Sequence, residues 1–90
     1  MSKRDKLIDR FLTKPKDFTW DELVRLLAVF GYSELKSGKT GGSRRRFANA
    51  EMEMLNFHKP HPGNIVMQYV LEQLIDFLNR QKQLTHERFT

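Results

Sequence analysis

Residues 19–36 read TWDELVRLLAVFGYSELK, and the spacing of the apolar side chains changes within this stretch. In its first part the apolar residues lie three and four positions apart, the spacing that places them on one face of a helix. These residues are Leu23, Leu26, Leu27 and Phe30. From Tyr32 onward the helical spacing ends and a short extended piece follows. The stretch therefore predicts a helix followed directly by a strand.

Both ends of this helix carry sequence signals. Thr19 is suited to accept a hydrogen bond from the amide of Glu22, whose side chain reaches back to the amide of Thr19 in a capping box. Gly31 follows the last apolar position and suits the left-handed conformation that closes many helices. We expect the helix to begin after Thr19 and to end at Gly31.

A shorter helix is expected before this one. Its apolar residues form a single stripe at Leu7, Ile8, Phe11 and Leu12. Pro15 then ends the helical pattern, because proline lacks an amide proton and disfavours helical geometry at the preceding Lys14. The stripe predicts packing and not ligand binding.

The rest of the chain predicts three strands, a loop and a last helix. The strands are expected at residues 32–36, 44–49 and 52–57, paired as two antiparallel hairpins. Two prolines and a glycine punctuate residues 59–64, and we expect other parts of the molecule to hold this loop. The helix that follows runs to about residue 81. Its broad apolar face contains Val66, Met67, Tyr69, Val70, Leu71, Leu74, Ile75, Phe77 and Leu78.

These elements predict one α+β domain over residues 1–90, in which helices cover one face of a three-stranded antiparallel sheet and residues 82–90 form a frayed tail. The chain has no cysteine, which excludes disulfides and favours a reducing cytoplasm. No window approaches the ~20 apolar residues that span a bilayer, so no membrane partner is expected. The formal net charge of +5 favours a polyanionic partner.

Residues 38–47 read GKTGGSRRRF and join a glycine-rich turn to a triply basic strand. Glycine lets a backbone approach phosphate closely, and guanidinium groups bind phosphate through paired hydrogen bonds. The glycine spacing is not that of a P-loop, so we do not expect nucleotide binding. The alternative function of the charges is to prevent edge-to-edge aggregation of an exposed strand. The residues predicted to bind RNA are Lys39, Ser43, Arg44, Arg45, Arg46 and, from the later loop, Lys59.

Two histidines, His58 and His61, flank Lys59 in the proline-containing loop. An imidazole can accept and return a proton near neutral pH, as the transesterification of RNA requires. The alternative is a loop whose histidines only form hydrogen bonds. Pro60 and Pro62 restrict the backbone on both sides of His61, so we expect it to be the better oriented of the two. Two histidines are too few for a structural zinc site, and no metal is expected.

Large apolar side chains elsewhere could be stacking surfaces for bases, but a domain of this size needs them for its core. We therefore predict that most of these residues are buried. They are Trp20, Phe30, Tyr32, Phe47, Leu55, Phe57 and Tyr69. His86 lies in the expected tail and is predicted to be exposed to solvent.

Taken together, these segments resemble HicA toxins of bacterial HicA–HicB toxin–antitoxin pairs. The resemblance covers roughly residues 5–81 and rests on a Gly-Ser-basic-basic-x-Phe strand, a Pro-His-Pro turn and an amphipathic helix in this order. It implies a fold like that of a double-stranded-RNA-binding domain, α-β-β-β-α, with an extra N-terminal helix. It further implies a cofactor-independent endoribonuclease that cleaves mRNA and is neutralised by a HicB antitoxin covering the active surface.

The chain departs from the family pattern at Arg44, because many HicA proteins have a histidine directly after Gly-Ser. His61 or His58 then supplies the proton transfer, or Arg44 and Arg46 act by electrostatic stabilisation alone, or the chain binds RNA or HicB without cleaving. We favour the first alternative, which makes His61, His58 and Arg44 the predicted catalytic residues.

Two other classes of function compete with the nuclease. One is a non-catalytic RNA-binding module that recognises structured RNA by shape. The other is a DNA-binding repressor that uses the helix after Thr19, but Asp21 and Glu22 on its outer side suit a phosphate backbone poorly. For the nuclease, the excess positive charge predicts an acidic antitoxin.

Overall fold

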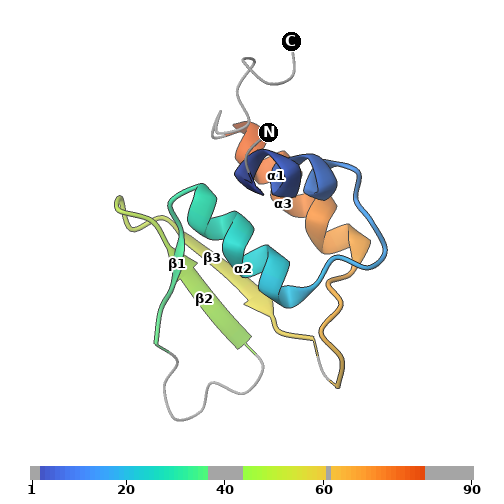
Figure 1. Cartoon of the computed structure of the whole chain (residues 1–90). Coiled ribbons are helices and arrows are strands. Elements are labelled where there is room, and N and C mark those ends of the chain that lie inside the picture. Colours follow the sequence, from blue (N-terminus) through green and yellow to red (C-terminus); the bar gives the residue numbers. More distant parts are fainter. Residues whose placement is uncertain (1–2, 37–43, 61, 81–90) are drawn as a thin grey trace.

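Helices and strands follow one another in the order α-α-β-β-β-α in the computed structural model, which describes residues 3–36, 44–60 and 62–80 (Figure 1). This order confirms the predicted α+β fold class. The elements are α1 (Lys3–Leu12), α2 (Trp20–Val29), β1 (Ser33–Glu34), β2 (Arg44–Ala48), β3 (Met54–His58) and α3 (Gln68–Arg80). No helix within these described ranges is long and apolar enough to cross a membrane.

The three strands form an antiparallel sheet in the order β1-β2-β3, so β2 lies in the centre. Strand β1 is only two residues long, shorter than predicted. Strand β3 begins at Met54, and the predicted start at Met52 is wrong. The side chain of Asn49 accepts hydrogen bonds from the amides of Glu51 and Glu53, at 3.0 and 2.9 Å, which closes a tight turn. Met52 lies in this turn with a positive φ of 62°.

Both predicted ends of α2 are confirmed. The amide of Glu22 donates to Thr19 Oγ1 at 3.1 Å, and the amide of Thr19 donates to Glu22 Oε1 at 2.9 Å, which completes the capping box. At the other end Gly31 has a φ of +89°, and its amide donates to the carbonyl of Ala28 at 3.0 Å. The chain therefore leaves α2 directly toward β1.

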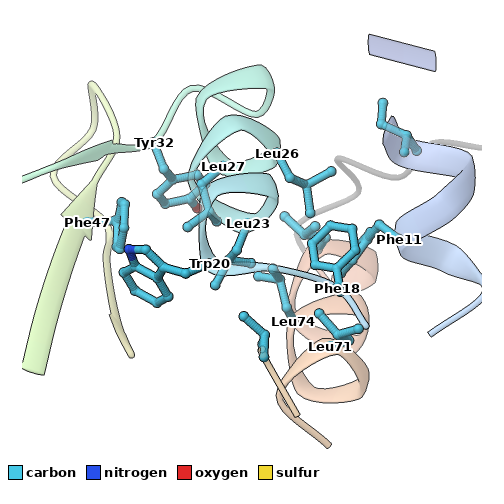
Figure 2. Close-up of a cluster of buried hydrophobic side chains, with 13 residues drawn as sticks. Phe11, Phe18, Trp20, Leu23, Leu26, Leu27, Tyr32, Phe47, Leu71 and Leu74 are labelled. Carbon is cyan, nitrogen blue, oxygen red and sulfur yellow. The ribbon is translucent and has the colours of Figure 1, made fainter. Parts of the chain in front are cut away.

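Helix α2 lies between the sheet and the pair formed by α1 and α3 (Figures 1 and 2). On the sheet side, the ring of Trp20 contacts that of Phe47 with 6.0 Å between centroids. On the other side, the ring of Phe11 in α1 packs against that of Phe18, with 5.9 Å between their centroids. One core thus continues from the sheet through α2 to the other helices. Its buried members are Ile8, Phe11, Phe18, Trp20, Leu23, Leu26, Leu27, Tyr32, Phe47, Val66, Leu71, Leu74 and Leu78.

Most aromatic residues predicted to lie in the core are buried or partly buried, but Tyr69 is not. Its exposed fraction is 58%, so the prediction of a buried Tyr69 is wrong. The buried face of α3 consists of Leu71, Leu74 and Leu78, and the first turn of this helix leaves Tyr69 outside that stripe. The helical spacing of apolar residues predicts a wider apolar face on α3 than the stripe of this helix that the core buries.

The segment before α3 is attached to the N-terminus of α2. The amide of Trp20 donates to the carbonyl of Asn64, and the amide of Val66 donates to the carbonyl of Phe18, both at 2.7 Å. Thr19 and Ile65 form an isolated antiparallel bridge between these bonds. Backbone pairing thus holds residues 64–66, as expected for this loop, and fixes the path of the chain beyond β3.

Candidate nucleic-acid interface

One face of the β2–β3 hairpin carries cationic and polar side chains. In the register of the two strands Arg44 lies opposite His58, and Arg46 lies opposite Asn56. Directly opposite residues project to the same face of an antiparallel sheet, with Cβ atoms about 4.5–5.5 Å apart. All four residues are exposed. Two strands that are separate in the sequence therefore bring two guanidinium groups, an imidazole and an amide together.

These side chains border a hollow of about 430 Å³, which we call the basic hollow. It is lined by Arg44, Arg46, Asn56, Phe57 and His58. Within the described part of the chain, no carboxylate contributes to this lining and neither arginine forms an ion pair. The positive charge of the basic hollow is therefore available to an anion, and a phosphate group matches guanidinium geometry.

Arg45 lies between these two arginines but projects to the other face of the sheet. Its Nε is 3.3 Å from Oε2 of Glu34, in the neighbouring strand β1. Successive side chains of a strand point to opposite faces, so Arg45 shares its face with Phe47, which is fully buried against the core. Arg45 was predicted to bind RNA together with its neighbours, and the structure does not bring it into the basic hollow.

The other predicted site residues separate into two groups. Lys59 is exposed but does not line the basic hollow; it borders two other depressions, one with Trp20, Arg25 and Glu34 and one between strand β3 and helix α3. Lys39, Ser43, His61 and His86 lie outside the described residues, so their functions stay predictions. Of the predicted catalytic residues, Arg44 and His58 are directly opposite each other in the register.

A second depression, of about 460 Å³, continues from the basic hollow between strand β3 and the first turns of α3. We call it the apolar groove. Its lining includes Asn56, His58, Ile65, Met67, Tyr69 and Gln73. The sequence patterns did not predict this groove, because they assigned the apolar residues around α3 to the core. The one signal in the sequence was that the apolar face of the last helix is broader than a short domain can cover.

A contrasting charged cluster joins α1 to the start of α2. Arg10 Nε donates to Glu22 Oε2 at 2.7 Å, and Arg10 Nη2 lies 3.1 Å from Asp17 Oδ1. The hydrogen bond from Arg10 lowers the pKa of Glu22, and the bond to Glu22 raises the pKa of Arg10. Because its charge is already neutralised, this cluster supports the packing of the helices.

Among the described residues, no group of three His, Cys, Asp or Glu side chains is arranged to hold a metal ion.

The chain matches no protein-family model, no curated protein and no solved structure. The resemblance to HicA toxins therefore rests on the residues and their arrangement.

Proposed function

We propose that this protein is a cofactor-independent endoribonuclease that cleaves mRNA, the toxin of a HicA–HicB type pair. The observation that carries the proposal is the strand register that sets His58 opposite Arg44, with Arg46 and Asn56 as the next pair. A group able to transfer protons thus adjoins two cations on one exposed surface. This combination meets the minimum requirement for cleaving an RNA phosphodiester.

The cleavage step needs no external reactant. The 2′-hydroxyl of the ribose loses its proton, its oxygen forms a bond to the adjacent phosphorus, and the bond from phosphorus to the 5′-oxygen breaks. The 5′-oxygen takes up a proton, which leaves a 2′,3′-cyclic phosphate and a free 5′-hydroxyl. In our proposal the imidazole of His58 transfers protons, while Arg44 and Arg46 bind the non-bridging oxygens and stabilise the charge that develops on them.

The position of His58 offers a reason why Arg44 can replace the histidine that many HicA proteins have after Gly-Ser. The family histidine would stand on β2 at position 44, and His58 faces this position from β3. The imidazole therefore comes from the neighbouring strand and still borders the same hollow. His61 remains the second candidate for proton transfer, since a complete cycle uses both an acid and a base.

The direct test incubates the purified protein with end-labelled single-stranded RNA in the presence of a chelator. We expect fragments that end in a 2′,3′-cyclic phosphate. The substitution His58→Gln is expected to slow cleavage by at least about 100-fold, the usual effect of losing a general acid or base. His61→Gln, measured in parallel, identifies the second proton-transfer group, and His86→Gln is the matched control. Intact RNA with the unsubstituted protein would disprove the nuclease.

The toxin assignment has a separate test in cells. Expression of the chain should arrest bacterial growth, and His58→Gln should relieve the arrest. Co-expression of an acidic protein encoded next to this chain should restore growth and form a complex with it, because opposite charges favour association. Normal growth of cells that express the unsubstituted chain would count against a toxin.

The second candidate function is an RNA-binding module without catalysis. The exposed arginines of the basic hollow favour it as much as they favour cleavage, because both functions need phosphate contacts. A mobility-shift gel distinguishes the two: a binding module retards labelled RNA and leaves it intact, whereas the nuclease produces fragments from the same sample.

A further inference from the structure

The apolar groove and the basic hollow are one continuous surface. Both are lined by Asn56, Phe57 and His58, which form the end of strand β3. A ligand held by Arg44 and Arg46 therefore lies next to the groove. The groove lining includes Ile65, Met67 and Tyr69.

The groove has an unusual composition for an exposed surface of a small domain. Ile65, Met67 and Tyr69 have exposed fractions of 43%, 66% and 58%. Such a cluster of large apolar side chains in solvent is costly and commonly marks a binding site. The polar groups at its border include the side-chain amides of Asn56 and Gln73 and the ammonium group of Lys59, and none of the described residues that line it is a carboxylate. The volume of about 460 Å³ falls within the range typical of small-ligand sites.

The groove is also formed in advance of binding. The backbone hydrogen bonds of Trp20 and Val66 attach one wall to the N-terminus of α2. The amide of Val70 donates to the carbonyl of Met67 at 3.0 Å, which extends the first turn of α3 backward to the groove. A wall held in this way loses little conformational entropy when a ligand binds.

We propose that the apolar groove binds one unstacked nucleobase of single-stranded RNA, next to the phosphate held in the basic hollow. The ring of Tyr69 provides the stacking surface, and the amides of Asn56 and Gln73 provide hydrogen bonds to the edge of the base. This inference rests on the proposed function and adds its substrate class. Bases of an RNA duplex are stacked and cannot enter a side groove, so the substrate is single-stranded.

Continuity with the basic hollow favours a nucleotide over a protein segment as the occupant. One nucleotide supplies an anion for Arg44 and Arg46 and a flat, mostly apolar base for the groove. A second copy of this chain also carries a net charge of +5, and repulsion between like net charges opposes association.

The test measures binding without cleavage. The probe is a short RNA in which every ribose is 2′-O-methylated, so the 2′-oxygen has no proton to lose. The reference probe is a backbone of equal length and charge that carries no bases. We expect the unsubstituted protein to bind the methylated RNA about 10-fold more tightly than the abasic backbone.

Tyr69→Ala should abolish this preference, whereas Tyr69→Phe should keep it because the ring remains. Met52→Ala is the matched control: Met52 is an apolar residue with an exposed fraction of 69% that lies in the β2–β3 turn, outside the groove lining. This control should leave the preference unchanged. Thermal unfolding midpoints that agree among the variants show that the fold is retained.

Equal affinities of the unsubstituted protein for the two probes would overturn the inference. It would also be overturned if Tyr69→Ala abolished self-association in sedimentation while RNA binding stayed the same, since the groove would then be an interface between copies. Failure of the nuclease gives a different result: RNA is bound with a preference for bases but stays intact. Conversely, cleavage that depends on His58 without any base preference keeps the nuclease and removes the groove from the site.

Discussion

The two faces of the β2–β3 hairpin differ sharply although the same strands form both. On one face Phe47 is fully buried, with its ring centroid 5.8 Å from that of Phe57 and 6.0 Å from that of Trp20. On the other face Arg44 and Arg46 are exposed and form the basic hollow. Successive side chains of a strand point to opposite faces, so the position of each arginine in the strand determines whether it is accessible to a ligand. The number of arginines does not.

The arginines of this protein also differ in what neutralises them. Arg10 binds Glu22 and Asp17, and Arg45 binds Glu34. Arg44 and Arg46 form no ion pair with the described residues. The arginines with carboxylate partners join elements of the fold, whereas the other two leave positive charge for a phosphate. Substitutions on each face test whether the paired arginines stabilise the fold and the other two bind phosphate.

The largest expected effect is on the buried face. Phe47→Ala should lower the free energy of unfolding by about 3–5 kcal/mol, because it removes a buried ring and leaves a cavity beside Trp20. Urea denaturation followed by circular dichroism measures this change. The control is Arg46→Ala, one position away on the exposed face, which should stay within about 0.5 kcal/mol of the unsubstituted protein. Equal losses in the two variants would contradict the assignment of the faces.

The next effect is on the exposed face. The double substitution Arg44→Ala with Arg46→Ala should weaken binding of 2′-O-methylated RNA by at least about 100-fold, since each charge-assisted hydrogen bond contributes about 1.5–3 kcal/mol. The slope of log affinity against log salt should become shallower by about 0.7 for each phosphate that the variant no longer binds. Fluorescence anisotropy at several salt concentrations measures both quantities, and the stability should hardly change.

Arg45→Ala is the matched control for this double substitution, because it removes the same charge from the same strand. It should retain most of the RNA affinity, since Arg45 projects to the other face and pairs with Glu34. An equal loss of affinity per arginine in all three positions would show that net charge, and not the strand face, determines binding.

A third prediction concerns Glu22, where charge supports the fold. Glu22→Gln keeps the capping box but removes the ion pair with Arg10, and should lower the stability near neutral pH by about 1 kcal/mol. The pKa of Glu22 is lowered in the folded state, so its contribution is present above the unfolded pKa and is lost as the pH falls through the folded one. Once the pH is below the lowered folded pKa of Glu22, the two proteins should therefore become similar in stability.

Denaturation curves collected over this pH range provide the measurement. The control is Asp21→Asn, which removes an exposed acid from the same helical turn. The difference in stability between Asp21→Asn and the unsubstituted protein should depend less on pH than the difference for Glu22→Gln. A stability difference for Glu22→Gln that persists in acid would rule out the charge as its cause.

The smallest expected effect is on the partly exposed ion pair between strands β1 and β2. Arg45→Ala should reduce the free energy of unfolding by about 0.5 kcal/mol, because solvent screens this pair. A double-mutant cycle with Glu34→Gln isolates the interaction and should give a coupling energy of about 0.2–1 kcal/mol. A coupling energy of zero would mean that the ion pair between Arg45 and Glu34 contributes nothing to stability.

Local signals predicted much of the fold. The capping box at Thr19, the helix end at Gly31 and the buried stripe of α2 all follow from interactions within a few residues, and all are confirmed. The wrong predictions have two causes, a local turn that was not recognised and a helical turn that the core does not cover. Met52 was predicted to be in a strand, but Asn49 closes a turn around it, and Tyr69 was predicted to be buried, but no other described element covers the first turn of α3 there.

The candidate site was predicted only in its components. The triply basic strand was identified from the sequence, but His58 was predicted to lie in a loop and is the last residue of strand β3. Which arginine lies opposite it depends on the strand register. A shift of one residue in the pairing of β2 with β3 would move both Arg45 and Phe47 to the exposed face. The apolar groove was not predicted, because it joins the end of β3 to residues on α3 that sequence patterns assign to the core.

Local sequence is enough to predict the order of the elements, the ends of α2 and the charge of β2, because these depend on backbone preferences and side-chain chemistry within short segments. It does not predict that His58 lies opposite Arg44, that Arg45 pairs with Glu34 or that a groove lies beside Tyr69. These features depend on strand register and on the attachment of residues 64–66 to α2. Both are contacts between segments far apart in the chain, which local patterns do not encode.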